Sequence, residues 1–410
     1  MTQTNTSLDF SSEKNSTTLT SDYLIVGGGC AGLSLAVRMA QNSFFSDKKI
    51  IIIEEDKKET DDRTWCFWEK KSNFFEKIVS KRWSDVYFYS QFFSKKLKLS
   101  PYEYKMIRGI DFYDYCKNEI AQSPNIQWIN EKVDRVGEDN EVPYAIVNGQ
   151  KIKSKYIFNS IRFQEPDYTK SHNLLQHFKG CYIETKTPFF NSNEATLMDF
   201  RIAQEGEVRF FYVLPLTDKK ALVEFTIFSE KLLANEGLYD IEVKKYLNDF
   251  LKLRANQDFE IYHEEFGVIP MSNARFAATL GKNIFNIGIT SGAARPSTGY
   301  TFTNIQKHCD EVVKKLLEGK TPILDDNFAK KRHFIYDSTL LNIMRFNKYE
   351  GAKLFARLFR WNSPKQVFKF LDGETNFLEE YVIMNTTPIL TMLPAFIKEI
   401  SELMNNKKKP

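Results

Sequence analysis

A short glycine-rich segment constrains the fold of this chain more than any other feature. The segment DYLIVGGGCAG, residues 22–32, places an apolar run before Gly27, Gly29 and Gly32, and the helix-like pattern LSLAVRMA follows it. This order of strand, glycine turn and helix is the dinucleotide-binding βαβ fingerprint. The glycines allow a tight turn and a close approach of the backbone to a pyrophosphate, which the helix N-terminus attracts.

A carboxylate follows where this fingerprint requires one. The second apolar run, residues 49–53, ends at Glu54, about twenty residues after the glycines, where an acidic side chain binds a ribose hydroxyl. A lone GxGxxG is weak evidence, because an ordinary glycine-rich turn can contain it. Here strand, turn, helix, second strand and carboxylate follow in order, so the sequence predicts a cofactor site that contains Gly27, Gly29, Gly32 and Glu54.

Composition limits the size, the partners and the compartment. A chain of 410 residues with 42% hydrophobic side chains is long enough for two or three domain-sized units. The net charge of +4 is small for this length, so no nucleic-acid partner is expected. The five cysteines and five histidines are scattered without metal-ligand spacing, which predicts reduced cytosolic thiols and no metal site.

The two ends of the chain are expected to lie outside the folded core. Residues 1–20 are rich in Ser, Thr and Asn and lack the apolar core of a signal peptide, which predicts a disordered leader. Residues 382–397 are apolar but contain Pro388 and Pro394, and they are too short to span a bilayer, which takes about twenty residues. The basic tail at 407–409 is interpreted as a solvated end, with a contact to anionic lipid as the alternative.

The pattern after Glu54 predicts an interrupted domain. Aromatic, β-prone segments follow the second strand, whereas a NAD-dehydrogenase runs its βαβ units consecutively. This departure favours an α/β flavoprotein with a discontinuous Rossmann-type FAD-binding domain, an inserted antiparallel β-sheet domain for the substrate and a helical C-terminal region. The expected ranges are 21–70, 107–165 and 280–320 for the FAD-binding domain, 71–106 and 166–279 for the sheet domain, and 321–410 for the helical region.

A second loop is expected to bind the cofactor. GITSGAARPSTGY, residues 288–300, runs from a strand end through small residues into a helix that begins near Thr301. Such a loop exposes N–H groups and the positive end of a helix dipole, which suit an FAD phosphate or the anionic edge of a reduced flavin. A merely tight connection is the alternative. The cofactor-binding residues expected in this loop are Gly292, Pro296, Thr298 and Gly299. Arg108, which lies before the helix-like segment 111–121, is a further expected cofactor-binding residue.

Glu224 is the candidate acid. It is the single carboxylate of the aromatic, β-branched strand LVEFT. If that strand is buried on both faces, desolvation raises the pKa of Glu224 and keeps the group protonated near neutrality, as a general acid requires. The alternative is an outward-facing residue, because Val223 and Phe225 lie on the opposite face of a strand.

Three large rings form a candidate substrate pocket. Trp65, Phe67 and Trp68 follow a polar start in the segment DRTWCFW. Their faces can line a polyene-shaped cavity or stabilise a cation, and core packing explains them equally well. The acidic side chains nearby are interpreted as solvated charges: Asp61, Asp62 and Glu69.

Several motifs occur in one order along nearly the whole chain between its two ends. They are DYLIVGGGCAGLSLA, DRTWCFW, LLQHFKG, LMDFR, FFYVLPL with LVEFT, GVIPM, AARPSTGYTF, IYDSTLL and FKFLDGET. In this combination the chain resembles the lycopene β-cyclase family of bacterial carotenoid pathways. Several motifs in the right order are more specific than any one of them.

The resemblance implies a flavin-dependent cyclase that consumes no net redox equivalents. An acid protonates the terminal double bond of an acyclic end of lycopene, the carbocation closes a six-membered ring, and proton loss leaves a β-ring, giving β-carotene through γ-carotene. Reduced FAD would stabilise the cation electrostatically, with NAD(P)H as a possible electron source. Glu224 matches the first carboxylate of the family's acidic motif, and Phe225 stands where the family usually carries a second one.

The resemblance also implies the partners and the location. Lycopene and other acyclic carotenoids are the expected substrates, other carotenoid-pathway enzymes are possible partners, and the expected location is the cytoplasm at the inner face of the cell membrane. Residues 382–397 are the candidate membrane contact. Two alternatives remain open, a flavin-dependent monooxygenase or reductase that acts on a prenyl lipid, and a non-enzymatic prenyl-lipid carrier. The ring type, the number of ends cyclised, the electron donor and the oligomeric state are not determined by the sequence.

Overall fold

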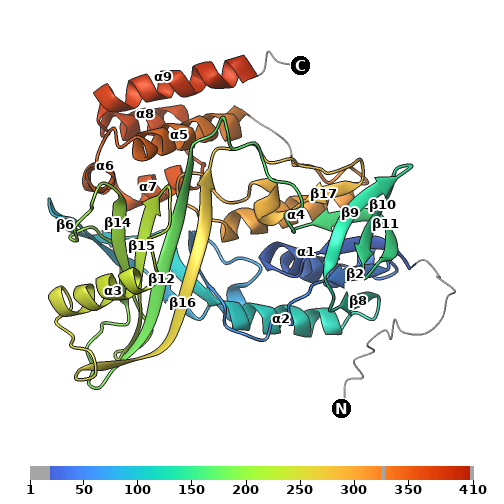
Figure 1. Ribbon diagram of the computed structural model, residues 1–410, viewed down its shortest axis with the longest axis horizontal. Helices are drawn as coiled ribbons and strands as arrows, with labels where there is room; N and C mark the ends of the chain where they lie inside the picture. The colour runs from blue at the N-terminus through green and yellow to red at the C-terminus, as the bar shows by residue number, and fades with distance from the viewer. Residues whose placement is uncertain (1–18, 325–327, 407–410) are drawn as a thin grey trace.

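A computed structural model describes residues 19–324 and 328–406. This part of the chain contains two large β-sheets, one small sheet and a C-terminal group of helices (Figure 1). The predicted leader, except its last two residues, and the basic tail at 407–409 lie outside the described residues.

The first large sheet is built around β1 (Thr20–Val26), the apolar strand before the glycine turn. Its parallel strands follow the order β8, β2, β1, β11 and β17, and β9 and β10 continue antiparallel from the first half of β11. The bounds are β2 Ile50–Ile53, β8 Ile126–Ile129, β9 Val133–Asp139, β10 Val142–Val147, β11 Gln150–Asn159 and β17 Ile284–Asn286. Strands from three separated parts of the chain therefore form one sheet.

Both faces of β1 are covered, which explains its continuous apolar sequence. Tyr23 and Ile25 pack beneath the helices α1 (Cys30–Ala40), α2 (Gly109–Ala121) and α4 (Phe302–Leu317), whereas Leu24 and Val26 pack beneath β9 and β10. The buried Arg38 of α1 bonds Asp310 and Gln306 of α4. The helices predicted after the glycine turn, at 111–121 and near Thr301 are confirmed, and α2 begins two residues before its predicted start.

The second large sheet has the order β16, β12, β15, β14, β13, β5 and β6. The bounds are β5 Asp85–Tyr89, β6 Ser94–Lys98, β12 Asn173–Thr185, β13 Glu194–Asp199, β14 Val208–Pro215, β15 Lys220–Ser229 and β16 Phe259–Ser272. It is antiparallel, as predicted, except where β13 pairs in parallel with β5, because the β5–β6 hairpin joins this sheet from a distant part of the chain.

The β-prone residues 81–89 are divided between two sheets. β4 (Lys81–Trp83) pairs with β7 (Glu103–Arg108), which also pairs with β3 (Thr64–Glu69), and these three strands form the small sheet. The next residues form β5 of the large sheet. Short 3₁₀ turns lie at η1 Ser43–Phe45, η2 Glu76–Ile78 and η3 Gly288–Ser291.

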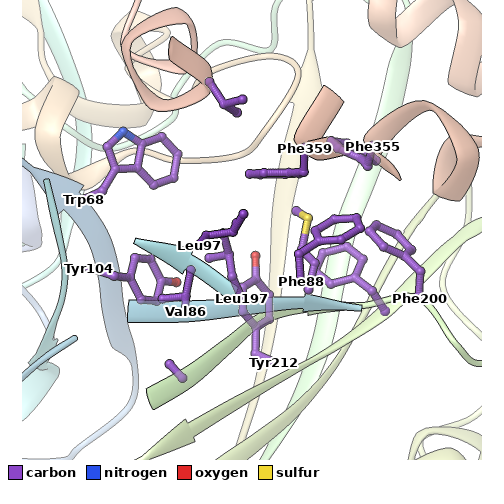
Figure 2. Packing of buried hydrophobic residues seen from close by; sticks show 14 of the residues in the cluster. Trp68, Val86, Phe88, Leu97, Tyr104, Leu197, Phe200, Tyr212, Phe355 and Phe359 are labelled. Carbon is purple, nitrogen blue, oxygen red and sulfur yellow. The ribbon is translucent and has the colours of Figure 1, made fainter. Parts of the chain in front are cut away.

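The two faces of the large sheet have different covers (Figure 1). Helix α3 (Gly237–Asp249) covers one face, where the ring of Tyr246 stacks on Phe211 with centroids 3.9 Å apart. The C-terminal helices cover part of the other face, and Figure 2 shows Phe355 and Phe359 above Phe88 and Phe200. These helices are α5 Phe328–Arg345, α6 Gly351–Trp361, α7 Pro364–Leu371, α8 Phe377–Asn385 and α9 Ile389–Asn406.

Local sequence explains where several of these helices begin. Ser363 and Gln366 form a capping box at the start of α7, and Asn376 and Glu379 form another at the start of α8, so that backbone N–H groups of each first turn are satisfied. None of the helices that the structure describes has both the length and the apolar character needed to cross a membrane.

A buried ion pair joins the helical region to the loop at 288–301. The Arg295 guanidinium donates to the Asp337 carboxylate of α5 over 3.1 Å and to the backbone carbonyl of Phe370 over 3.3 Å, and the Ser297 hydroxyl donates to the same carboxylate. The side chains of Arg295 and Asp337 are 9% and 8% exposed. Removing one partner of such a pair leaves a buried charge without compensation.

We therefore predict that Asp337→Ala lowers the free energy of unfolding by about 3–5 kcal/mol, measured by urea denaturation. The control is Lys282→Ala, which removes the exposed pair with Glu141 and is expected to cost less than about 1 kcal/mol. Equal losses in the two variants would contradict a structural role for the buried pair.

Candidate active site

A cavity of about 520 Å³ lies where the two large sheets meet. Three parts of the chain line it: the glycine turn with the start of α1, the loop at 288–301 with the start of α4, and one face of the second sheet with the start of β3. The residues from these parts include Gly29, Cys30 and Ala31; Gly288, Thr298, Gly299, Tyr300 and Phe302; and Thr64, Trp65, Gln176, Tyr212, Glu224 and Glu265. The fold thus brings the fingerprint and the candidate acid to one space.

Glycine occupies the three predicted positions of the fingerprint for different structural reasons. Gly27 has φ +96°, and a Cβ there would lie 2.2 Å from the Ser160 hydroxyl oxygen. A Cβ at Gly32 would lie 1.9 Å from the carbonyl oxygen of Gly27. Gly29 has φ −78°, which any residue adopts, and nothing lies within 4 Å of its Cβ position. Gly27 and Gly32 are required by the turn, whereas Gly29 leaves open space at the edge of the cavity.

Glu54 lies at the end of β2, as predicted, and its carboxylate is directed to the glycine turn. One oxygen accepts from the Gly28 backbone N–H over 2.6 Å, and the other accepts from the Asp56 N–H over 2.9 Å. The Lys58 ammonium lies 3.7 Å away. These contacts hold a carboxylate beside the turn, the position that a ribose hydroxyl requires.

The loop at 288–301 fits a polar ligand. Gly288 has φ +69° and approaches α1 so closely that a Cβ would lie 2.7 Å from the Cβ of Ala31. The Thr298 hydroxyl and the Gln176 side-chain oxygen are buried in the cavity lining, and neither has a hydrogen-bond partner among the described residues. Buried polar atoms without partners cost free energy, so this wall of the cavity is suited to a ligand with polar groups.

The other predicted cofactor residues have different surroundings. Gly292 ends the short turn η3 with φ +80°, and Gly299, with φ +69°, lies against Gln176. Pro296 lies within the same loop. The Arg108 guanidinium makes two hydrogen bonds to Asp61, of 2.9 and 2.7 Å, so the charge of Arg108 is already compensated.

Glu224 lies in a row of residues that crosses the second sheet. In the strand register it faces Tyr212 of β14 on one side and Gly180 of β12 on the other, and Gly180 in turn faces Glu265 of β16. Directly opposed residues of antiparallel strands point to the same face. Phe225 points to the opposite face, where its ring stacks on Phe211 beneath α3.

Glu265 is a site residue that the sequence prediction missed. Its carboxylate lines the same cavity as Glu224 and accepts a hydrogen bond of 2.9 Å from the Thr64 hydroxyl. The adjacent Glu264 is exposed and lies 3.4 Å from Lys179 on the other face. The available signal was the strand alternation in HEEFGVIPM, which turns only one of the two glutamates inward, but the sequence does not show which face meets Glu224.

Burial raises the pKa of both carboxyls. For Glu224 the largest cause is desolvation, followed by the charge of Glu265, and the hydrogen bond from Thr226 opposes the shift. For Glu265 desolvation is again the largest cause, and the hydrogen bond from Thr64 opposes it. The sequence left open whether strand 222–226 is buried on both faces or turns Glu224 outward. In the structure the flanking residues are buried and Glu224 is half-buried, facing the cavity, and a carboxyl in this environment holds a proton near neutrality.

Three tyrosine hydroxyls lie beside this pair. Tyr300 lies 3.5 Å from both Tyr104 and Tyr212, measured between hydroxyl oxygens, and burial raises the pKa of all three. A smaller apolar void shares Tyr212 and Tyr300 with the main cavity and continues toward the rings of α6 and α7. Ring faces and apolar side chains therefore extend inward from the carboxyl pair.

The three predicted pocket rings take three different positions. Trp65 lines the main cavity. Trp68 lines the smaller void, contacts Tyr300 with ring centroids 4.2 Å apart, and donates to the Asp372 carboxylate. Phe67 is buried in the core of the first sheet, where it stacks on Phe302.

The interpretation of the nearby acids as solvated charges is wrong for Glu69. Its side chain is only 9% exposed and pairs with the buried ammonium of Lys105 over 2.7 Å, because β3 and β7 of the small sheet bring them to one face. Asp62 lines the main cavity and accepts from the Tyr113 hydroxyl. Asp61 is the partly exposed partner of Arg108.

A histidine and two glutamates, which have no ligand spacing in the sequence, meet away from this cavity. Ligand atoms of His172, Glu399 and Glu402 lie within 4.8 Å of one another. The His172 ring lies 2.8 Å from the Glu399 carboxylate, which also accepts from Asn342. These bonds fasten α9 to α5 and to the start of the second sheet, which is a sufficient structural role.

Comparisons with known proteins identify relatives along most of the chain. The family model described as "Lycopene cyclase protein" matches residues 22–396. A lycopene beta-cyclase of Pseudescherichia vulneris is 23% identical and covers 95% of this chain and 99% of its own length. A lycopene beta cyclase of Synechococcus elongatus is 20% identical, and the match covers 82% of this chain and 86% of the relative. A chloroplastic neoxanthin synthase of Solanum lycopersicum is 23% identical, and the match covers 75% of this chain and 62% of the relative.

Solved structures with a similar fold include a flavoprotein. A flavoprotein/dehydrogenase of Cytophaga hutchinsonii has a TM-score of 0.61 at 13% identity and covers 93% of this chain and all of its own. A geranylgeranyl bacteriochlorophyll reductase-like protein of Thermoplasma acidophilum has a TM-score of 0.59 at 13% identity, over 94% and 100%. These likenesses confirm the predicted fold class, a Rossmann-type α/β flavoprotein fold with an added sheet and a helical C-terminal region.

Proposed function

The chain belongs to the lycopene cyclase family, whose model matches residues 22–396, and we propose that it is a lycopene β-cyclase. The observation that carries this proposal is the position of Glu224, a half-buried carboxyl with a raised pKa in a cavity lined by aromatic rings and by the glycine turn. A proton donor in an apolar, ring-lined space suits the protonation of a hydrocarbon double bond.

Glu224 starts the reaction by protonating the terminal double bond of an acyclic end of lycopene. Its raised pKa keeps the proton in place until an alkene arrives. The carbocation is captured by a double bond of the same chain, which closes a six-membered ring, and loss of a proton leaves the β-ring. No electron is gained or lost overall. The polyene is much longer than the cavity, so the two ends enter in turn.

The surrounding rings protect and stabilise the cation. Trp65, Tyr212 and Tyr300 line the cavity around Glu224, and their ring faces are negative. The tyrosine hydroxyls remain neutral because burial raises the pKa of each. The smaller void beyond Tyr300 has almost entirely apolar walls, which exclude the water that would capture a cation before ring closure.

We propose FAD as the cofactor of this site. Gly29 and the loop at 288–301 would hold its phosphates, Glu54 would bind the ribose, and Thr298 would satisfy its hydroxyl with a polar ligand atom. When bound and reduced, with NAD(P)H as the proposed electron source, the flavin supplies a negative charge that stabilises a cationic transition state. The residues fit this group because Gly29 leaves open space and Thr298 is buried in the lining without a described partner.

Gly29→Val tests the cofactor site. Because Gly29 has an ordinary negative φ and an open Cβ position, the variant is expected to fold normally but to purify without flavin, since the new side chain fills the phosphate space. Flavin absorbance and circular dichroism measure the two properties. Gly32→Ala is the contrast, because its Cβ collides with the backbone and should disturb the fold as well. Normal flavin content in Gly29→Val would place the cofactor elsewhere.

Glu224→Gln tests the acid. The amide keeps the size and hydrogen bonding of the side chain but cannot donate the proton, so cyclisation is expected to fall by a factor of about 10² to 10⁴, while flavin content stays normal. Lycopene then accumulates in a pigment assay of lycopene-producing cells. Glu224→Asp keeps the acid with a shorter reach and should retain part of the activity. Wild-type levels of β-carotene from the Gln variant would assign the proton to another group.

An apolar surface on the last two helices is the proposed membrane contact. The exposed side chains are Leu378, Tyr381 and Val382 on α8, and Ile389, Leu390, Leu393 and Ile397 on α9. Their spacing places them on one stripe of each helix, and Figure 1 shows α9 at the upper edge of the molecule. The predicted contact at 382–397 thus covers the end of α8 and the first half of α9. Because lycopene dissolves in lipid and not in water, we propose that this surface binds the bilayer from which the substrate comes.

The membrane contact predicts a specific loss of binding. A double variant, Leu378→Gln with Leu390→Gln, should bind phospholipid vesicles that contain lycopene at least about tenfold more weakly in co-sedimentation, since each leucine loses its burial in lipid. Ile241→Gln, on the exposed face of α3, is the matched control and should bind normally. Undiminished vesicle binding by the double variant, or a change in oligomeric state instead, would show that the surface contacts something other than lipid.

The alternative functions predict different NAD(P)H consumption and different fates of the lipid. A monooxygenase or reductase that acts on a prenyl lipid would consume NAD(P)H in proportion to product, whereas a cyclase needs it only to reduce the flavin. A prenyl-lipid carrier would bind lycopene without flavin and leave it unchanged. Pigment analysis together with NAD(P)H consumption by the purified protein distinguishes the three.

A further inference from the structure

We propose that Glu265 is a second catalytic carboxyl, which shares one proton with Glu224 and accepts the proton that ring closure releases. This inference rests on the proposed cyclase function. It assigns to one carboxyl pair the two proton transfers that the reaction needs, one to the substrate and one from it.

The strand register places the two carboxyls on one face with a single glycine between them. Gly180 of β12 is the direct partner of Glu224 on one side and of Glu265 on the other. All three positions point to the same face of the sheet, and both glutamates line the main cavity. A substrate end in that cavity therefore meets both carboxyls.

The absence of a side chain at Gly180 provides the space that the pair needs. A Cβ at this position would lie 2.9 Å from Cγ of Glu265, 3.1 Å from its Oε1 atom and 2.9 Å from Leu222. The Glu265 side chain therefore extends over Gly180, in the direction of Glu224. Any other residue at 180 would push this carboxylate away from the row.

The hydrogen bonds leave one oxygen of each carboxyl available. Thr226 donates to Oε1 of Glu224, and Thr64 donates to Oε2 of Glu265. The Tyr182 hydroxyl lies 2.5 Å from the Thr64 oxygen. The hydroxyls of Tyr182 and Thr64 therefore form a chain of hydrogen bonds that ends at Glu265. The Oε1 atom of Glu265, which lies over Gly180, has no donor among the described residues.

The charges around the pair favour one shared proton. In the described part of the chain, neither carboxyl has a salt bridge, whereas Asp61 pairs with Arg108 and Asp62 pairs with Arg63. Five further titratable groups around the pair are neutral when protonated: Cys66, Tyr104, Tyr182, Tyr212 and Tyr300. Arg63 lines the same cavity but its charge is compensated by Asp62, and His263 lies two residues from Glu265 on the same face of β16. Two buried carboxyls without a cation do not both ionise readily, so the pair holds one proton and one negative charge near neutrality.

The bonds, charges and protons balance over the two proton transfers. The O–H bond of Glu224 breaks as a C–H bond forms at the terminal alkene, which leaves a carbocation on the substrate and a second negative charge in the pair. After the ring closes, a C–H bond next to the cation breaks, its electrons form the ring double bond, and the proton passes to Glu265. Transfer of that proton from Glu265 to Glu224 restores the pair, and no proton is consumed.

The pH profile of Glu265→Gln tests the proposal. The wild type should show a bell-shaped dependence of kcat on pH, because the active pair carries one proton: at low pH the base is protonated and at high pH the acid is ionised. In Glu265→Gln, kcat should fall by about 10² or more with little change in KM. The acidic limb should disappear, and the alkaline limb should move to lower pH, because the negative neighbour that raises the pKa of Glu224 is gone.

Two further variants make the interpretation specific. Glu264→Gln changes the adjacent carboxylate on the opposite face and should keep the wild-type rate and profile. Glu265→Asp keeps a base and should keep a bell-shaped profile at a reduced rate. If Glu265→Gln matches Glu264→Gln, or loses activity equally at every pH with the bell intact, Glu265 is not a proton acceptor and the proposal is wrong.

Infrared titration separates this inference from the proposed function, because it needs no substrate. The wild type should show a protonated carboxyl at neutral pH that Glu224→Gln removes, and in Glu265→Gln the corresponding band should disappear at a lower pH than in the wild type. An unchanged titration in Glu265→Gln would overturn the shared proton even in an active cyclase. A wild type that forms no β-rings but shows these shifts would refute the proposed substrate and leave the carboxyl pair standing.

Discussion

The close contact of one loop with all three parts of the fold is the constraint on which the site depends. At 288–301 the chain packs against the first turn of α1 through Gly288 and Ala31, and against the second sheet through Gly299 and Gln176. Its Arg295 reaches the helical region at Asp337. Two of these contacts allow no Cβ on the glycine, so the sheet that carries the carboxyls is held at a fixed distance from the glycine turn.

The alternation of side chains along β15 explains the departure from the family's acidic motif. Glu224 faces the cavity, whereas Phe225 enters the core beneath α3 and stacks on Phe211. An acid at position 225 would be buried in that core, away from the cavity, where an unpaired charge is costly. In this chain the second carboxyl near Glu224 comes instead from β16, across Gly180. The replacement by Phe225 is therefore compatible with a cavity that still holds two acids.

The high aromatic content has two roles in the structure. Many rings fill the core between the second sheet and the C-terminal helices, where Figure 2 shows rings from several elements gathered together. Others, such as Trp65 and Tyr300, line the cavity and its apolar extension. Because aromatic rings are large and mainly apolar, the rings that contribute to the core and line the void, such as Trp68 and Phe359, leave a space suited to a hydrocarbon.

The sequence by itself determined the features that depend on residues close together in the chain. The turn at Gly27 and Gly32 and the carboxylate at Glu54 follow from local spacing, and the structure confirms their positions. Only the tertiary structure decided which distant residues meet. Glu265 joins Glu224, Glu69 pairs with Lys105, and Trp65 and Phe67 separate into cavity and core, because strand register and sheet order bring them together or apart. A shift of one residue in that register would turn Glu265 to the opposite face, and no local pattern in the sequence specifies it.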